Sequence, residues 1–179
     1  MNKVKLHDKE FEVYLHSKKI QERLQEIGKQ ISQEFKGEKI ILLGVLNGSF
    51  MVMADLARAI ELELSCEFVK ISSYSGTETT GKVKSLIGLS AEIKDKSVII
   101  VEDIVDTGIS MKYLLEELEK QNPKKIAIAT LLFKKEAFRF NYPLDYVGFE
   151  IPNKFVVGYG LDYDGLGRNL PDVYQLSSQ

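Results

Sequence analysis

The chain has 179 residues, enough for one domain with a substantial hydrophobic core but short for two. Its 44% of hydrophobic and 28% of charged residues are typical of an ordinary globular protein. Because 24 Lys and Arg residues are set against 26 Asp and Glu residues, the net charge of −2 gives no electrostatic reason to expect a nucleic-acid or membrane partner.

The N-terminal stretch and the cysteine content indicate where the protein works. Residues 1–15 lack the apolar segment of a signal peptide, and no apolar run in the chain approaches about 18 residues. The single cysteine, Cys66, excludes an internal disulfide and suits a reducing compartment. We therefore expect a cytoplasmic protein.

The first part of the chain alternates between helix and strand patterns. A helix is predicted from Ser17, its N-cap, to about Lys36, because apolar residues recur every three or four positions before Gly37. The continuous apolar run at 39–46 has the length and composition of a strand that is buried on both faces of a parallel sheet. After a break at Asn47–Ser49, a second helix is predicted from Phe50 to about Ile60.

A half-exposed strand and a polar loop follow. Four apolar residues alternate with polar ones over 61–68, so Cys66 and its apolar neighbours are expected on the packed face of a strand. The segment Ser72–Lys82 is rich in Ser, Thr and Gly, and Tyr74 is its only large anchor. A polar connection of this length inside a compact domain is typical of a functional lid or a disordered loop.

The remaining segments complete the predicted fold. Strands are predicted at 98–101, 125–133 and 144–151, and a helix from Ser110 to Gln121. This alternation predicts an α/β fold, a single domain whose mostly parallel, twisted sheet is flanked by helices. We expect this core at about 38–150, and a small hood built from the N-terminal segment and residues 151–179.

Acids and hydroxyls meet near the end of the third predicted strand, at the edge of the sheet where such folds bind ligands. Thr107, Gly108 and Ser110 lead into a helix, whose free backbone N–H groups and dipole favour a phosphate. Glu102 and Asp103 would repel a phosphate at the same spot, so we expect them to face sugar hydroxyls or a Mg²⁺ ion. A ribose 5-phosphate satisfies both halves of this pattern.

A less specific interpretation of the segment stays open. Asp-Thr-Gly after a strand is often only a turn in which the aspartate caps the helix. The Gly-x4-Gly-Lys spacing of a P-loop is missing. The longer pattern at 98–108 joins four β-branched residues, two acids, two apolar residues and Asp-Thr-Gly, and it indicates a ligand site more specifically than Asp-Thr-Gly alone.

This segment resembles the phosphoribosyl-diphosphate-binding signature of the type I phosphoribosyltransferases. Other motifs narrow the likeness to the hypoxanthine-guanine phosphoribosyltransferase family. The sequence GVLNGSF at 44–50 is similar to that family's pyrophosphate loop, and SSYSGTETTGKVK at 72–84 to its mobile lid. LLFKK at 131–135 resembles its base-recognition segment, and GFEIPNKFVVGYGLDY at 148–163 resembles its purine pocket. The resemblance covers about residues 40–175.

The resemblance implies a reaction and a cofactor. Hypoxanthine or guanine and phosphoribosyl diphosphate would give IMP or GMP plus pyrophosphate, a step of purine salvage that uses Mg²⁺.

The resemblance also implies a role for each matching residue. The ribose and its 5′-phosphate would be bound by Glu102, Asp103, Thr107, Gly108 and Ser110, the pyrophosphate by Asn47, Gly48, Ser49 and Arg168, and Mg²⁺ by Glu102, Asp103 and Asp162. The purine would contact Lys134 through its 6-oxo group, Phe155 by stacking and the backbone of Val156, while Asp106 would be the catalytic base at N7. Ser73 and Tyr74 would close the lid.

One position departs from the family pattern. Many members carry a lysine where this chain has Asn47, so a fixed positive charge beside the pyrophosphate is missing. The backbone amides of Gly48 and Ser49 could still bind its oxygens. Whether the family's cis peptide in this loop persists with asparagine is left open by the sequence. The chain has four arginines, each a candidate to bind phosphate with its planar fork: Arg23, Arg58, Arg139 and Arg168.

Alternatives remain at the level of residue and of function. A lone lysine after a strand, such as Lys134, is usually a solvated strand end, and Phe155 could belong to the core. A protein of this fold could instead be a nucleotide-sensing regulator that binds nucleic acid, or a phosphoribosyltransferase for another base. We expect an enzyme with small-molecule substrates that assembles as a homo-oligomer, a dimer or a tetramer.

Overall fold

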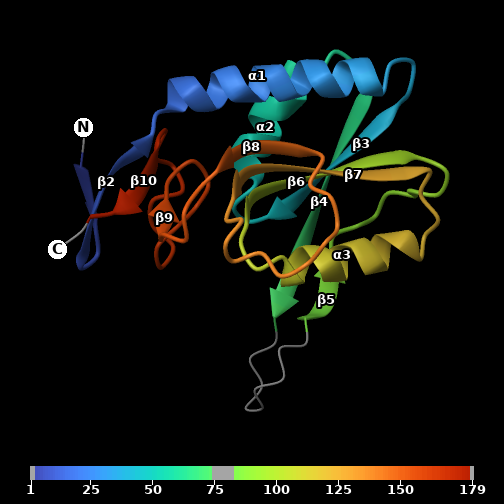
Figure 1. Ribbon diagram of the computed structural model, residues 1–179. Coiled ribbons are helices and arrows are strands. Elements are labelled where there is room, and N and C mark those ends of the chain that lie inside the picture. Colours follow the sequence, from blue (N-terminus) through green and yellow to red (C-terminus); the bar gives the residue numbers. More distant parts are fainter. Residues whose placement is uncertain (1–2, 74–82, 178–179) are drawn as a thin grey trace.

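Six strands form the central sheet of the computed structural model, which describes residues 3–73 and 83–177 (Figure 1). In spatial order they are β5 (Val83–Ile87), β4 (Leu64–Ser73), β3 (Ile40–Leu46), β6 (Ser97–Val105), β7 (Lys125–Phe133) and β8 (Tyr146–Glu150). The strands from β4 to β8 pair in parallel, and β5 joins the edge antiparallel to β4. The predicted α/β fold with a mostly parallel sheet is confirmed.

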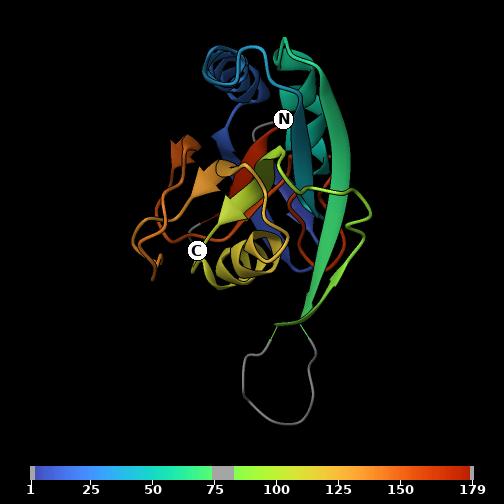
Figure 2. The same ribbon diagram turned by 90° about the vertical axis from the view of Figure 1, so that its right-hand side faces the viewer.

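Helices cover both faces of this sheet, as Figure 2 shows. Helices α1 (Ser17–Glu34) and α2 (Phe50–Ala59) pack on one face, and α3 (Ile109–Glu119) packs on the other. Because both faces are covered, β3 and β6 are built from nearly continuous apolar residues, and Leu42 and Ile99 are fully buried. The three predicted helices are confirmed to within two residues at each end.

The N-terminus of α1 is capped in a way that the sequence did not predict. Ser17 is the first helical residue and not the N-cap, which is His16. The Ser17 backbone N–H donates a hydrogen bond of 2.6 Å to the Asp172 carboxylate. The cap therefore comes from a residue 155 positions away in the chain, where local sequence patterns give no signal for it.

A second, four-stranded antiparallel sheet forms the predicted hood, on the left in Figure 1. Its order is β1 (Lys3–Leu6), β2 (Lys9–Leu15), β10 (Val173–Leu176) and β9 (Val156–Val157). Both ends of the chain thus meet in one sheet, because β2 near the N-terminus pairs directly with β10 near the C-terminus. The hairpin of β1 and β2 was not predicted, although its apolar residues alternate with charged ones as in a half-exposed strand.

The expectation that Cys66 packs in the core is wrong, because its side chain is exposed. Alternation along β4 was recognised, but the fully buried Val69 lies on the opposite face, and Leu64 on the expected face is only partly buried against the core. Val69 and Ile71 pack with the α3 side of the core, whereas Phe68, on the same face as Cys66, is 37% exposed. Strand β4 also continues through Ser72 and Ser73, which were expected in the loop. Tyr74 and the rest of the expected lid lie outside the described residues.

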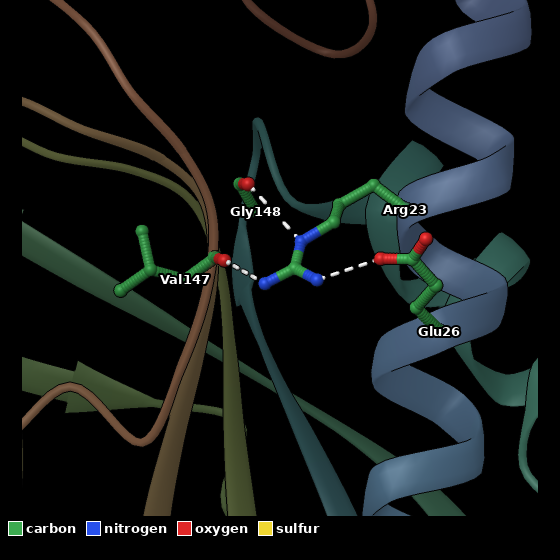
Figure 3. Close-up of polar contacts among 4 residues, drawn as sticks. All are labelled: Arg23, Glu26, Val147 and Gly148. Atoms are coloured by element: carbon green, nitrogen blue, oxygen red, sulfur yellow. Dashed lines mark hydrogen bonds and ion pairs between the residues drawn. The ribbon is translucent and has the colours of Figure 1, made fainter.

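An arginine links α1 to the sheet edge at β8 (Figure 3). The Arg23 guanidinium donates to the backbone carbonyls of Val147 and Gly148 at 2.9 and 3.2 Å, and to Glu26 at 2.7 Å. Arg23, one of the four candidate phosphate ligands, therefore binds backbone carbonyls of the fold instead.

Among the described helices, none is long and apolar enough to cross a membrane.

Candidate active site

The carboxyl ends of β3, β6 and β7 converge on a cavity of about 420 Å³, which the hood closes from the other side. Eleven of the predicted site residues line this cavity: Asn47, Gly48, Glu102, Asp103, Asp106, Ser110, Lys134, Phe155, Val156, Asp162 and Arg168. They come from segments more than 100 residues apart in the chain. These side chains thus meet beyond the carboxyl ends of the parallel strands, where folds of this kind bind their ligands.

The loop after β3 is tightly packed against the acids of β6. Its Leu46–Asn47 peptide bond is cis. A side chain at Gly48 would collide with the Asp103 carboxylate, and one at Gly160 would collide with the Gly48 carbonyl. These two glycines let the β3 loop, β6 and the hood approach one another. Ser49 is fully buried at the start of α2 and does not line the cavity.

Glu102 and Asp103 are adjacent, partly buried carboxyl groups at the end of β6. Burial, together with the charge of Asp103, raises the pKa of Glu102 well above its ordinary value. Burial also raises the pKa of Asp103, opposed by the Ile104 N–H, which donates to its carboxylate at 2.8 Å, and by the charge of Arg168. Two carboxylates held together in this way form a site that favours a cation or hydroxyl donors.

The residues predicted to form a phosphate cradle lie at a smaller cavity of about 140 Å³ beside the first. Thr107, Gly108, Ile109 and Ser110 line it, and α3 begins at Ile109. Gly108 has a φ of 84°, the left-handed conformation that favours glycine. Free N–H groups at the first turn of α3 therefore face a space of suitable size for an anion.

Asp106 and Lys134 form an ion pair between the two cavities. The Lys134 ammonium donates to the Asp106 carboxylate at 2.9 Å. Lys134 is only 8% exposed, so it is not the solvated strand end of the alternative interpretation. A buried lysine and an accessible carboxylate side by side can act on two neighbouring polar atoms of one ligand.

The hood contributes an aromatic ring and a charged pair to the cavity. Phe155 is 45% exposed, so it is not a core residue, and its ring lies against those of Phe11 and Tyr163 at centroid distances of 6.2 and 5.8 Å. Arg168 forms an ion pair of 2.6 Å with Asp162 and donates to the Gly160 carbonyl at 2.6 Å. The Gly165 N–H donates to the other Asp162 oxygen at 2.7 Å. The arginine is thereby held at the cavity wall by its own loop.

The donor set fits Mg²⁺ bound together with a substrate. Among residues 3–73 and 83–177, no three His, Cys, Asp or Glu side chains are grouped as ligands for a metal ion. Mg²⁺ commonly takes one or two carboxylates and completes its shell with water and substrate oxygens. The repulsion between Glu102 and Asp103, which raises the pKa of Glu102, is what a divalent cation would relieve.

Several lining residues were not predicted. Val45, Ile71, Ile104 and Leu161 give the cavity its apolar walls. Their apolar side chains follow strand and core patterns, so nothing in the sequence distinguishes them from core residues. Of the two predicted lid residues, Ser73 ends β4, and Tyr74 lies outside the described residues.

Comparison with known proteins identifies the family of this site. The model of the phosphoribosyl transferase domain matches residues 11–164. A hypoxanthine-guanine phosphoribosyltransferase of Dictyostelium discoideum is 42% identical over 173 residues, which are 94% of this chain and 96% of that protein. A hypoxanthine phosphoribosyltransferase of Escherichia coli is 44% identical over 165 residues, 90% of this chain and 93% of that protein. The crystal structure of a hypoxanthine-guanine phosphoribosyltransferase from Bacillus anthracis is 37% identical, with a TM-score of 0.84 over 93% of this chain and 97% of that one. The chain belongs to the hypoxanthine-guanine phosphoribosyltransferase family.

Proposed function

We propose that the protein transfers the 5-phosphoribosyl group of phosphoribosyl diphosphate to hypoxanthine or guanine, giving IMP or GMP and pyrophosphate. The observation that carries this proposal is the adjacency of two cavities, one lined by a phosphate cradle and the other by paired acids and a base pocket. A phosphorylated ribose spans such a pair, with its phosphate at Thr107–Ser110 and its hydroxyls near Glu102 and Asp103.

The base pocket supports a purine with a 6-oxo group. Lys134 carries hydrogen-bond donors only, and its amine lies 2.9 Å from the Asp106 carboxylate, which carries acceptors only. A purine bearing an acceptor at position 6 and a proton at N7 complements both groups. Phe155 exposes a ring face that can stack on the base, and the Val156 backbone lies beside it.

The polar groups of the cavity then have distinct tasks. As N9 of the purine bonds to C1′ of the ribose, the bond from C1′ to the pyrophosphate oxygen breaks. Asp106 takes the proton that the purine loses from N7, because that proton becomes more acidic as the base bonds to the sugar. Arg168 and the amide of Gly48, which line the cavity, bind the leaving pyrophosphate, whereas the predicted contribution of Ser49 is dropped because its N–H donates to the Val45 carbonyl inside the fold. Glu102, Asp103 and Asp162 would hold Mg²⁺ together with the substrate, and the bound ion would offset the charge that grows on the leaving group.

We further propose that the protein is a homo-oligomer. Phe50 at the start of α2 and Phe68 on β4 are 40% and 37% exposed, and Cys66 lies exposed on the same strand. Exposed aromatic side chains of this kind are typical of association surfaces. A free surface thiol also agrees with the reducing cytoplasm expected from the sequence. Light scattering at micromolar concentration should give a multiple of the chain mass, and a monomer would contradict the proposal.

One assay tests the reaction itself. Pyrophosphate release from phosphoribosyl diphosphate should require a purine with a 6-oxo group and be absent with adenine or a pyrimidine base. It should stop when a chelator removes Mg²⁺ and return when Mg²⁺ is added in excess. Lys134→Ala should weaken hypoxanthine and guanine selectively, since their shared 6-oxo group loses its donor. Wild-type turnover of adenine as fast as hypoxanthine would contradict the role of Lys134.

A further inference from the structure

The segment between β7 and β8 packs beneath the phosphate cradle. The Tyr142 hydroxyl donates a hydrogen bond of 2.8 Å to the Gly108 carbonyl, and the Arg139 backbone N–H donates one of 3.2 Å to the Thr107 carbonyl. Two consecutive carbonyl groups of the cradle are therefore bound by residues of one segment. Neither Tyr142 nor Arg139 lines the cradle cavity, so they act from behind it.

These two hydrogen bonds, with a third from the Lys112 N–H of α3 to the Gly108 carbonyl at 3.0 Å, determine where the cradle's donors point. In a planar trans peptide unit, the carbonyl and the following N–H point in opposite directions. With the Thr107 and Gly108 carbonyls held toward the segment, the N–H groups of Gly108 and Ile109 are directed to the opposite side. That side is where the cavity of about 140 Å³ lies.

The rings of the segment leave little room for another arrangement. An ideal Cβ built on Gly108 would lie 2.5 Å from the Tyr142 hydroxyl and 2.6 Å from the Phe138 ring. The rings of Phe138 and Tyr142 pack edge to face, at a centroid distance of 5.1 Å. Burial and the charge of Glu102 raise the pKa of Tyr142 to about 12, so its hydroxyl keeps the proton that it donates.

We infer that Tyr142 is a positioning residue for the 5′-phosphate of the substrate. It touches neither phosphate nor sugar, but it holds the Gly108 carbonyl away from the phosphate and so aims the next N–H group toward it. Preorganised N–H donors bind an anion without the cost of reorienting when it arrives. This inference rests on the proposed function, because that function supplies the ligand with a 5′-phosphate.

Two fragments of the substrate separate this role from a general loss of structure. Ribose 5-phosphate carries the 5′-phosphate but no pyrophosphate. Inorganic pyrophosphate matches the leaving group but has no 5′-phosphate. Tyr142→Phe removes one hydrogen bond and leaves the ring packing in place. It should weaken ribose 5-phosphate about 2- to 12-fold, the range expected for one hydrogen bond, and leave pyrophosphate affinity unchanged. In turnover, KM for phosphoribosyl diphosphate should rise while KM for hypoxanthine stays the same.

A matched control is Tyr146→Phe. The Tyr146 hydroxyl also donates a buried hydrogen bond, to Glu34 on α1, and Tyr146 does not line either cavity. This control should lower stability and leave the affinities for both fragments unchanged. Binding of ribose 5-phosphate by Tyr142→Phe as tightly as by wild type, or equal weakening of both fragments, would overturn the inference. Titration calorimetry of the fragments needs no turnover, so a wild type that binds them but releases no pyrophosphate with hypoxanthine would refute only the proposed reaction.

Discussion

Asp106 and Lys134 neutralise each other in the free protein, and both face the cavity in which the base is expected. Lys134 is buried, so its charge depends on this one carboxylate at 2.9 Å for compensation. In the proposed function, a purine with a 6-oxo group would insert between this donor and this acceptor and take over part of the pairing. The two residues would then face adjacent atoms of the base, with the proton at N7 on the side of Asp106.

Replacing Asp106 by asparagine tests its role as a base. Asp106→Asn keeps the shape of the side chain but removes the proton acceptor, so the chemical step should slow about 10²- to 10⁴-fold. Affinity for phosphoribosyl diphosphate should stay near that of wild type. The measurement is a single-turnover rate, because product release can hide a slower chemical step at steady state.

The matched control for this variant is Asp95→Asn, an exposed aspartate in a left-handed turn where asparagine is equally suitable. It should turn over like wild type. If Asp106→Asn also reacted within a few-fold of wild type, Asp106 would serve only as the partner of Lys134 and not as a base.

Glu102 should destabilise the free protein and stabilise the complex. Its folded pKa is raised by burial and by Asp103, so its stabilising contribution is full only below the ordinary pKa of 4.5 and is lost as pH rises through the folded pKa. Glu102→Gln removes this ionisation. The variant should be more stable than wild type to urea at neutral pH, and the difference should shrink as pH falls toward 4.5.

The same variant should bind substrate poorly. Hydrogen bonds to charged groups contribute about 1.5–3 kcal/mol, so affinity for phosphoribosyl diphosphate with Mg²⁺ should fall about 10- to 150-fold. Glu22→Gln, an exposed glutamate of α1, should change neither property. A pH-independent stability difference between Glu102→Gln and wild type would show that the carboxyl ionises as easily as in the unfolded chain.

At the scale of elements, Arg23 binds α1 to two backbone carbonyls of the edge strand β8 (Figure 3), beside the hydrogen bond from Tyr146 of β8 to Glu34 of α1. Arg23→Met keeps the apolar stem but leaves two edge carbonyls without their charged donor. The free energy of unfolding should fall by about 1.5–3 kcal/mol, measured by urea denaturation. Glu26→Gln breaks only the exposed ion pair on α1 and should cost less than about 1 kcal/mol. Equal losses in the two variants would contradict a specific role for the Arg23 bonds to β8, and neither variant should alter KM.

The elements that the sequence predicted are those whose burial is simple. A strand covered on both faces, such as Ile40–Leu46, has a continuous apolar run, and α3 carries its buried residues at helical spacing. The exposure of Cys66 was missed, because alternation does not tell which face of a strand another element will cover. The hairpin of β1 and β2 was missed although it alternates, and its sheet is completed by β10 from the other end of the chain.

The candidate site divides in the same way. Polar residues at strand ends, such as Glu102 and Lys134, stand out against an apolar background, and the structure brings them to one cavity. Ile104 and Leu161 could not be recognised, since their side chains resemble core residues. By residue type Arg23 and Arg168 were both candidates for binding phosphate, and the family resemblance singled out Arg168; their positions in the fold now separate a structural link from a cavity wall.

At the scale of the whole molecule, the cavity lies between the central sheet and the hood, whose residues pack into one common hydrophobic cluster. One hydrophobic cluster joins Leu42 and Ile99 of the central sheet to Leu15, Val156 and Val173 of the hood. Helix α1 belongs to this cluster and is capped by Asp172, just before β10. The hood therefore has little hydrophobic core that it does not share with the central sheet, which fixes the wall formed by Phe155 and Arg168 relative to the strand ends.

This shared core predicts that the chain unfolds as one cooperative unit, the single domain expected from its length. Calorimetry should give one transition whose calorimetric and van't Hoff enthalpies agree, and whose size approaches about 0.7 kcal/mol per residue. Val173→Ala opens a cavity in the hood part of the cluster, where Val173 is fully buried, and should lower the midpoint of the entire transition. Val4→Ala, in the small satellite core of the hood, should have a smaller effect because Val4 is only partly buried.

Two resolved transitions, with Val173→Ala moving only the smaller one, would mean that the hood is a separate domain and that the base pocket can open without unfolding the sheet. Scans at several protein concentrations distinguish this outcome from the dissociation of an oligomer, because only dissociation depends on concentration.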